Sequence, residues 1–201
     1  MRSSDIRDEY LAAMRRMTLA DAHELLAADI PIESVSMLCP APTRVRLEAK
    51  RRYCPDPDGG RAHVFPVTSV DPARPHAIEA DDCRKAISIG HIIDLMAVNI
   101  RAPGKWALRI GAATVLGAVE HQHGLFCEPV PIHRDVLDWL CSGCKGIVFL
   151  TPDPYERGRI LRQLTAPQAG DLEHKAELDR LMTFAYPLRS IAVVRQQEAA
   201  A

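Results

Sequence analysis

Apolar residues repeat at helical spacing from Thr18 onward. The Thr18 hydroxyl can cap the first turn of a helix, and Asp21, three residues later, can accept a bond from the free amide. One apolar stripe follows, formed by Leu19, Ala22, Leu25 and Leu26. This pattern predicts a helix that begins at Thr18. Residues 1–17 are charged and have no clean period, so we expect a flexible, frayed N-terminus.

Proline changes the pattern in the next part of the chain. Eight of the fifteen prolines lie between Pro31 and Pro75, which argues against helix there. Short β-rich stretches alternate with turns, and the candidate strands are 35–38, 44–47 and 63–67. Residues 56–60 read Asp-Pro-Asp-Gly-Gly and predict a turn. Segments 87–90, 92–100 and 106–110 are rich in β-branched and aromatic residues and predict a β-meander.

After residue 124, strand and helix patterns alternate. Strands are predicted over 125–130, 146–150 and 188–194, and helices over 134–141, 154–164 and 171–184. Asp153 is a suitable cap for the second of these helices, with Pro154 at the first helical position and Glu156 closing a capping box. In the third helix we expect four residues on the inner side: Leu172, Leu178, Leu181 and Met182. This alternation implies at least some parallel strand pairing.

Together these patterns predict an α+β or α/β fold, in which an N-terminal helix and a β-rich half precede a small α/β layer. The expected division is a flexible segment 1–17, a helix and β-rich subdomain 18–120, an α/β subdomain 121–194 and a flexible tail 195–201. A single continuous domain over 18–194 is the alternative.

Charge and cysteine content narrow the function classes. The 201 residues carry 25 basic and 26 acidic side chains, and a net charge of -1 argues against a strongly basic polyanion binder. Six cysteines are far fewer than a disulfide scaffold needs, and the charged N-terminus lacks the apolar core of a signal peptide. We therefore expect a cytoplasmic protein. Because Asp94 and Asn99 interrupt the best apolar run, we expect no membrane role.

Local basic runs stand out against this balance. Cys39-Pro40 and Cys54-Pro55 enclose one of them and resemble the zinc-ribbon module of bacterial primases, but neither Cys has a second ligand two to four residues on. A phosphate-contacting role for the basic side chains is one interpretation, and a solvated strand face is the other. The candidate nucleic-acid-binding residues, including those of a second run in the 154–164 helix, are Arg44, Arg46, Lys50, Arg51, Arg52, Arg157, Arg159 and Arg162.

Two tryptophans lie among apolar neighbours at matching period. We therefore expect Trp106 and Trp139 to be core residues. A stacking platform for a base is the alternative for Trp106, with Arg101 and Arg109 as its neighbours.

Residues able to bind metal gather around the 134–141 helix. They are His121, His123, Cys127, His133, Cys141 and Cys144. Cys141 and Cys144 supply one half of a zinc site, but no second pair follows, and Cys144 also fits as a small apolar residue before a buried strand. We predict no cofactor, with zinc or magnesium as the alternatives.

The order of elements around Glu128, Asp135, Asp138, Asp153 and Gly158 resembles the Toprim domains of primases and topoisomerases, so the α/β layer is expected to be Toprim-like or Rossmann-like. That resemblance implies magnesium held by Glu128 and Asp153, with Asp135 or Asp138 as further ligands. Pro129 and Thr151 replace the Gly and the first Asp of the family pattern. The solvated side of a helix is the alternative for Asp135 and Asp138.

Segments 94–98, 105–117 and 134–144 resemble uncharacterised alphaproteobacterial proteins found in prophage-like and mobile-element settings. This resemblance implies a neighbourhood of replication and recombination genes, and hence a nucleic acid or a replication or recombination protein as partner. The first hypothesis is a noncatalytic accessory or nucleic-acid-associated protein of mobile-element DNA metabolism. The alternatives are a metal-dependent enzyme that processes nucleotides or phosphodiesters, and a protein–protein interaction module.

Overall fold

Five short strands close into a barrel in the first half of the chain. The computed structural model describes residues 3–68, 92–102, 104–117, 129–164 and 166–185. The barrel strands are β1 (Ala41–Glu48), β2 (Arg52–Pro55), β3 (Gly60–Thr68), β4 (Ile92–Val98) and β5 (Trp106–Leu108). Their order around the barrel is β1-β2-β5-β4-β3, and only the β2–β5 pair is parallel. The predicted strands at 44–47 and 63–67 are confirmed within β1 and β3, and the β4–β5 pair confirms that part of the meander.

A helix precedes the barrel where fraying was expected. Helix α1 spans Ser3–Met14 and packs on β1, β3 and β4. Its buried side chains Ile6, Tyr10 and Ala13 follow each other at spacings of four and three, which places them on one helix face. The Tyr10 hydroxyl also donates to the carbonyl oxygens of Leu38 and Cys39 at 2.8 and 3.0 Å. One face of α1 therefore belongs to the core, and the prediction of a frayed N-terminus was wrong for residues 3–14.

Two short helices follow α1. Helix α2 (Leu19–Leu26) has the predicted capping box between Thr18 and Asp21, although Leu19 is 74% exposed and lies off the buried stripe. Helix α3 (Ile32–Leu38) replaces the strand predicted at 35–38. The prolines do not oppose it, because Pro31 is the N-cap residue and Pro40 lies beyond the helix end.

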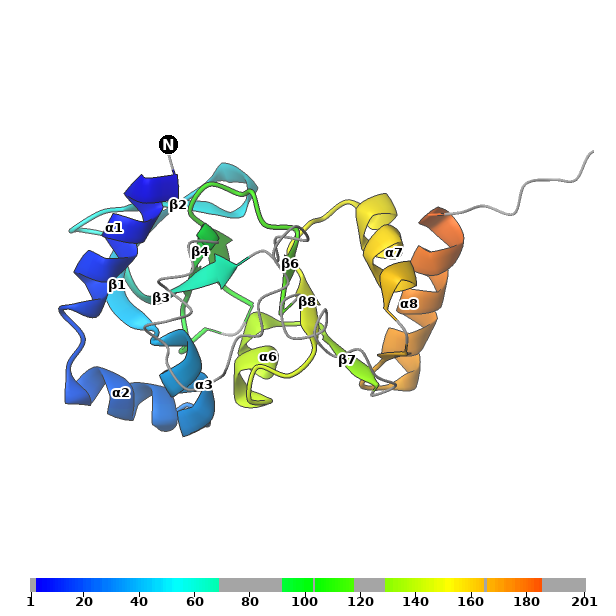
Figure 1. The fold of residues 1–201 in the computed structure, drawn as a ribbon, viewed down its shortest axis with the longest axis horizontal. Coiled ribbons are helices and arrows are strands. Elements are labelled where there is room, and N and C mark those ends of the chain that lie inside the picture. Colours follow the sequence, from blue (N-terminus) through cyan, green and yellow to red (C-terminus); the bar gives the residue numbers. More distant parts are fainter. Residues whose placement is uncertain (1–2, 69–91, 103, 118–128, 165, 186–201) are drawn as a thin grey trace, which may run out of the picture.

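Among the described residues, a small second sheet and three helices make up the other half of the fold (Figure 1). Its order is β6 (Val115–Leu116), β8 (Ile147–Phe149), β7 (Val130–His133) and β9 (Pro167–Gln168). Strand β7 is parallel to both β8 and β9, so the expected parallel pairing is present. The helices are α6 (Val136–Cys141), α7 (Pro154–Gln163) and α8 (Leu172–Ala185). The chain thus has the mixed α and β architecture that the patterns predict.

One apolar cluster joins the two halves. Phe65 of β3 and Trp139 of α6 stack with ring centroids 6.4 Å apart. The Ser34 hydroxyl of α3 donates to the Leu140 carbonyl of α6 at 2.7 Å. Trp106 belongs to the same cluster, which confirms the two tryptophans as core residues. Within the described residues, no helix is long and apolar enough to cross a bilayer.

Some predictions differ in detail or lie outside the described residues. Leu172 is 86% exposed, so its predicted inner position was wrong, whereas Leu178 is buried. Glu156 pairs with Arg159 instead of closing a capping box at Asp153. The segments that fall wholly or mostly outside the described residues are 87–90, 125–130, 188–194 and 195–201.

Candidate nucleic-acid interface

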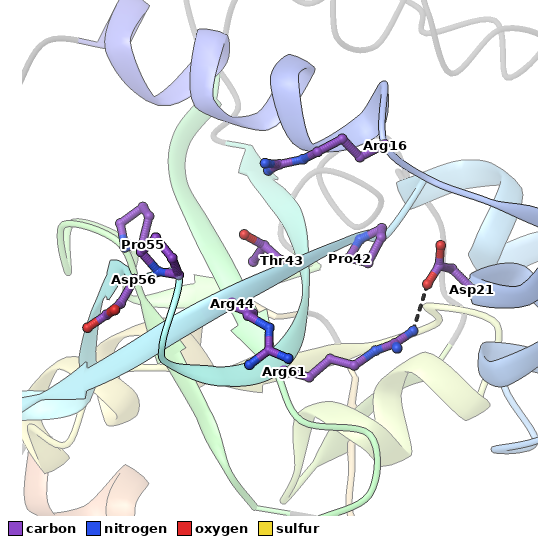
Figure 2. A pocket seen from close by; sticks show the side chains of 9 residues that line it. Arg16, Asp21, Pro42, Thr43, Arg44, Pro55, Asp56 and Arg61 are labelled. Carbon is purple, nitrogen blue, oxygen red and sulfur yellow. Dashed lines mark hydrogen bonds and ion pairs between the residues drawn. The ribbon is translucent and has the colours of Figure 1, made fainter.

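An open pocket of about 550 Å³ lies on the outer surface of the barrel. Side chains from four places in the chain converge on it: the turn after α1, the start of α2, strand β1, and the β2–β3 connection with β3 (Figure 2). Its lining residues are Arg16, Asp21, Pro42, Thr43, Arg44, Pro55, Asp56, Pro57 and Arg61. A cavity of this size is within the range of small-ligand sites.

The β1–β3 pairing brings two of the pocket arginines together. Arg44 and Arg61 are Cα partners in the antiparallel ladder, so their side chains leave the same face of the barrel. Arg61 Nη2 lies 2.6 Å from Asp21 Oδ1 and 2.6 Å from Glu24 Oε2. The Arg44 guanidinium instead donates to the Gly59 carbonyl oxygen at 3.2 Å.

The pocket carries a net positive charge once the ion pairs of its two aspartates are counted. Hydrogen bonds from Thr18 hold the pKa of Asp21 below its ordinary value, and the charge of Asp21 is met by Arg61. Asp56 lies 3.6 Å from Arg46 and also accepts the Asp58 amide. Within the described residues, neither Arg16 nor Arg44 has a carboxylate within 4.0 Å of its guanidinium. These two charges are available for an anion.

A basic strip continues from the pocket along β1 to the next turn. Arg46 follows Arg44 on the outer face, and the short η1 helix (Ala49–Arg51) leads to Arg52 at the start of β2. The Arg51 guanidinium lies over the Trp106 ring, 4.5 Å from its centroid. The sequence suggests Arg101 and Arg109 as the arginines beside this ring. Arg109 instead stacks on Tyr53. Glu48 is the cross-strand partner of Arg52 and the acidic member of this strip.

The three candidate arginines of α7 have internal partners. Arg157 donates to the Thr151 carbonyl at 2.7 Å and lies over Phe149. Arg159 forms two bonds to Glu156. Arg162 donates to the Met182 carbonyl near the end of α8 at 3.0 Å. The eight sequence candidates therefore fall into two groups. Those between β1 and β2 lie on the barrel surface, where Arg44 lines the pocket. Those of α7 bond to residues of their own helix and of its neighbours.

The predicted magnesium ligands are not brought together among the described residues. Asp135 and Asp153 are N-cap residues that accept the amides of Leu137 and Tyr155 at 2.7 and 3.0 Å. Asp138 is exposed on α6. Asp135 lies before the helix, so of these two residues only Asp138 occupies the solvated side of α6. Glu128 lies outside the described residues.

The cysteines and histidines around α6 are also engaged separately. His133 Nε2 lies 2.9 Å from the Lys145 carbonyl oxygen, and Cys144 is buried in the core. Burial raises the pKa of the Cys141 thiol, and its sulfur donates to the Ala28 carbonyl. His121, His123 and Cys127 lie outside the described residues.

Three pocket or near-pocket residues were missed by sequence reasoning: Arg16, Arg61 and His63. Arg61 lies two residues before the predicted strand 63–67, and only the β1–β3 register makes it the Cα partner of Arg44 on the same outer face. Asp21 was interpreted only as a capping residue, and Glu24, one turn further along α2, was overlooked. Comparisons with protein-family models, curated proteins and solved structures found no match to the chain.

Proposed function

We propose that this chain is a noncatalytic nucleic-acid-binding accessory protein that holds a single strand by its phosphates. The observation that carries the proposal is the pocket in which Arg16 and Arg44 present charges that no described carboxylate balances. A guanidinium matches phosphate geometry through paired N–H donors, so two such groups in one concavity suit a phosphodiester.

The pocket walls favour a single strand over a duplex. Pro42, Pro55 and Pro57 supply rigid apolar surface between the arginines. A sugar or unpaired base can enter a concavity of nucleotide size, whereas the bases of a duplex are stacked inside it. Small five-stranded barrels are also a recurrent platform for oligonucleotides, which supports the proposal by fold-level analogy alone.

The basic strip gives the strand a path out of the pocket. From Arg44 to Glu48 the chain extends over roughly 13 Å at the rise of a β-strand, which is long enough for consecutive phosphates. Arg51 and Arg52 lie at its far end and are exposed. The resemblance of the chain to mobile-element proteins supports a role in replication or recombination of such elements.

Fluorescence anisotropy with a labelled oligothymidine of about 16 nucleotides tests the proposal. Binding at about 20 mM salt that weakens steeply by about 200 mM is expected, because phosphate contacts release counterions. Arg44→Ala should weaken binding and flatten the slope of log affinity against log salt by about 0.7, the value for one lost single-strand phosphate contact.

Arg159→Ala is the matched control, because it removes an arginine that already has Glu156 as partner. It should leave both the affinity and the salt slope unchanged. Absence of binding at about 20 mM salt would contradict the proposal. An equal loss in both variants would show that binding does not depend specifically on the pocket.

A further inference from the structure

A second cluster of polar side chains lies beside the pocket. Asp21 and Glu24 are three residues apart on α2 and therefore share a helix face, and His63 reaches them from β3. One ligand atom from each of the three lies within 4.8 Å of the others. Among the described residues, this is the only group of three or more such side chains that meets that limit.

The histidine of this cluster has an unmet bonding capacity. His63 is 2% exposed, and its Nε2 is the only buried side-chain nitrogen or oxygen without a hydrogen-bond partner in the described part of the chain. A buried polar atom left without a partner costs free energy that a bound ligand would recover. Burial lowers the pKa of the His63 imidazole, which favours the neutral form that binds metals.

The cluster already accommodates a positive charge. Arg61 Nη2 lies 2.6 Å from both Asp21 Oδ1 and Glu24 Oε2, and Arg101 Nη2 lies 2.7 Å from Glu24 Oε1. The Arg61 side chain is 52% exposed, so its guanidinium can turn outward without leaving a cavity in the core. Two carboxylates that converge on one guanidinium nitrogen can converge on a metal ion in its place.

We propose that Asp21, Glu24 and His63 form a binding site for a divalent transition cation, and that the ion takes the position of the Arg61 guanidinium. Zn²⁺ is the ion to expect, because it accepts imidazole and carboxylate ligands together and binds such sites more tightly than Mn²⁺. Ligand atoms about 2.1 Å from a tetrahedral ion lie about 3.4 Å apart. The three ligand atoms of the cluster lie within 4.8 Å of one another, so small side-chain rotations bring them to this separation when the ion binds.

This site goes beyond nucleic-acid binding and does not depend on it. Three protein ligands leave a fourth tetrahedral position open to water or to an oxygen donor. Asp21 also lines the pocket, and a displaced Arg61 would turn its charge toward Arg44. If the proposed nucleic-acid function holds as well, the ion should therefore strengthen phosphate binding.

Isothermal titration of the full-length chain with Zn²⁺, and separately with Mg²⁺, tests the site. One equivalent of Zn²⁺ should bind, with Mg²⁺ much weaker. His63→Gln and Glu24→Gln should each weaken Zn²⁺ by about 10- to 100-fold or more. Glu33→Gln is the matched control, since Glu33 is exposed on α3 and outside the cluster. Circular dichroism confirms folding, and Glu24→Gln carries the test if His63→Gln does not fold.

Arg61→Met separates a metal site from a structural ion-pair cluster. Removal of the internal cation should tighten Zn²⁺ binding, whereas a purely structural role predicts no gain. Bound Co²⁺ should give visible d–d absorption without a thiolate charge-transfer band, which excludes a site built from the cysteines. The proposal is overturned if wild type binds no stoichiometric Zn²⁺, or if Glu24→Gln binds as tightly as wild type. DNA binding without Zn²⁺ binding would overturn this site alone, and the reverse result would overturn only the proposed function.

Discussion

Arg44 and Arg61 lie directly opposite each other across the antiparallel β1–β3 ladder. Like charges in this position repel, typically by a few tenths of a kcal/mol up to about 1 kcal/mol. Asp21 and Glu24 offset the charge of Arg61, whereas the Arg44 guanidinium donates to the Gly59 carbonyl and has no carboxylate within 4.0 Å among the described residues. Under the proposed function, the two arginines lie together because they bind an anion, although their mutual repulsion lowers the stability of the fold.

Arg44→Thr should therefore separate stability from binding. Threonine suits an exposed strand position and removes the like-charge pair, so the free energy of unfolding should stay equal to that of wild type or rise by up to about 1 kcal/mol. Affinity for single-stranded DNA should fall in the same variant. Urea unfolding and anisotropy measure the two quantities, and a fall in both would show that Arg44 has a structural role instead.

Asp94 organises the loop between β5 and β6. Its carboxylate is fully buried and accepts the amides of Leu95, Ile110 and Ala112 at 2.8, 3.0 and 2.7 Å. Asp94→Ala leaves these donors without partners, so we expect a loss of at least about 3 kcal/mol in the free energy of unfolding. Asp138→Ala, at an exposed carboxylate, should cost no more than about 0.5 kcal/mol by the same urea titration.

Local signals along the chain predicted the elements better than they predicted the site. Thr18 and Asp153 were identified as helix caps because capping depends on neighbours two or three residues away. Helix α1 was missed because only Ile6 in its buried stripe is strongly apolar, the others being Tyr10 and Ala13. Its place in the core depends on contacts with the barrel, which no local pattern shows.

The pocket depends on strand register. Arg44 was a candidate from the sequence, yet its partner Arg61 is set by how β1 pairs with β3. Asp135 and Asp153 were proposed as metal ligands, but each occupies an N-cap where its oxygen binds a backbone amide. From the sequence alone, a carboxylate before a helix can be either a metal ligand or a helix cap, and only the fold distinguishes the two roles.

Gly146 lies where β8 approaches β7. Its φ is +85°, and an added Cβ would overlap the carbonyl oxygen of Pro131. Trp139 Nε1 donates to the Gly146 carbonyl at 3.0 Å, so displacement of this backbone would also disturb the core. Gly146→Ala should destabilise the protein by at least about 2 kcal/mol more than Gly143→Ala.

Gly143 is the matched control because its φ is +78°, but nothing beyond its own chain neighbours lies within 4 Å of the position that an added Cβ would take. Gly143→Ala should therefore cost only the left-handed strain of about 1–2 kcal/mol. Thermal unfolding of both variants measures the difference. Equal destabilisation would mean that the close contact with Pro131 relaxes at no cost.

His174 should make stability depend on pH. The side chain is 5% exposed, and burial lowers the pKa of its imidazole below the ordinary value of 6.5. The unfolded chain then binds more protons than the folded chain at pH values between the lowered pKa and 6.5, so the free energy of unfolding rises with pH through this window and levels off above it. Burial also lowers the pKa of His63, so this residue adds to the pH dependence of stability in the same direction.

Replacement of His174 by asparagine isolates its share of this pH dependence. His174→Asn keeps an acceptor near the position of Nδ1, which accepts the Gly170 amide, but removes the titration. Urea unfolding between about pH 5 and 7 should show a shallower slope for His174→Asn than for wild type. An unchanged slope in His174→Asn would show that His174 takes up its proton in the folded chain as readily as in the unfolded one.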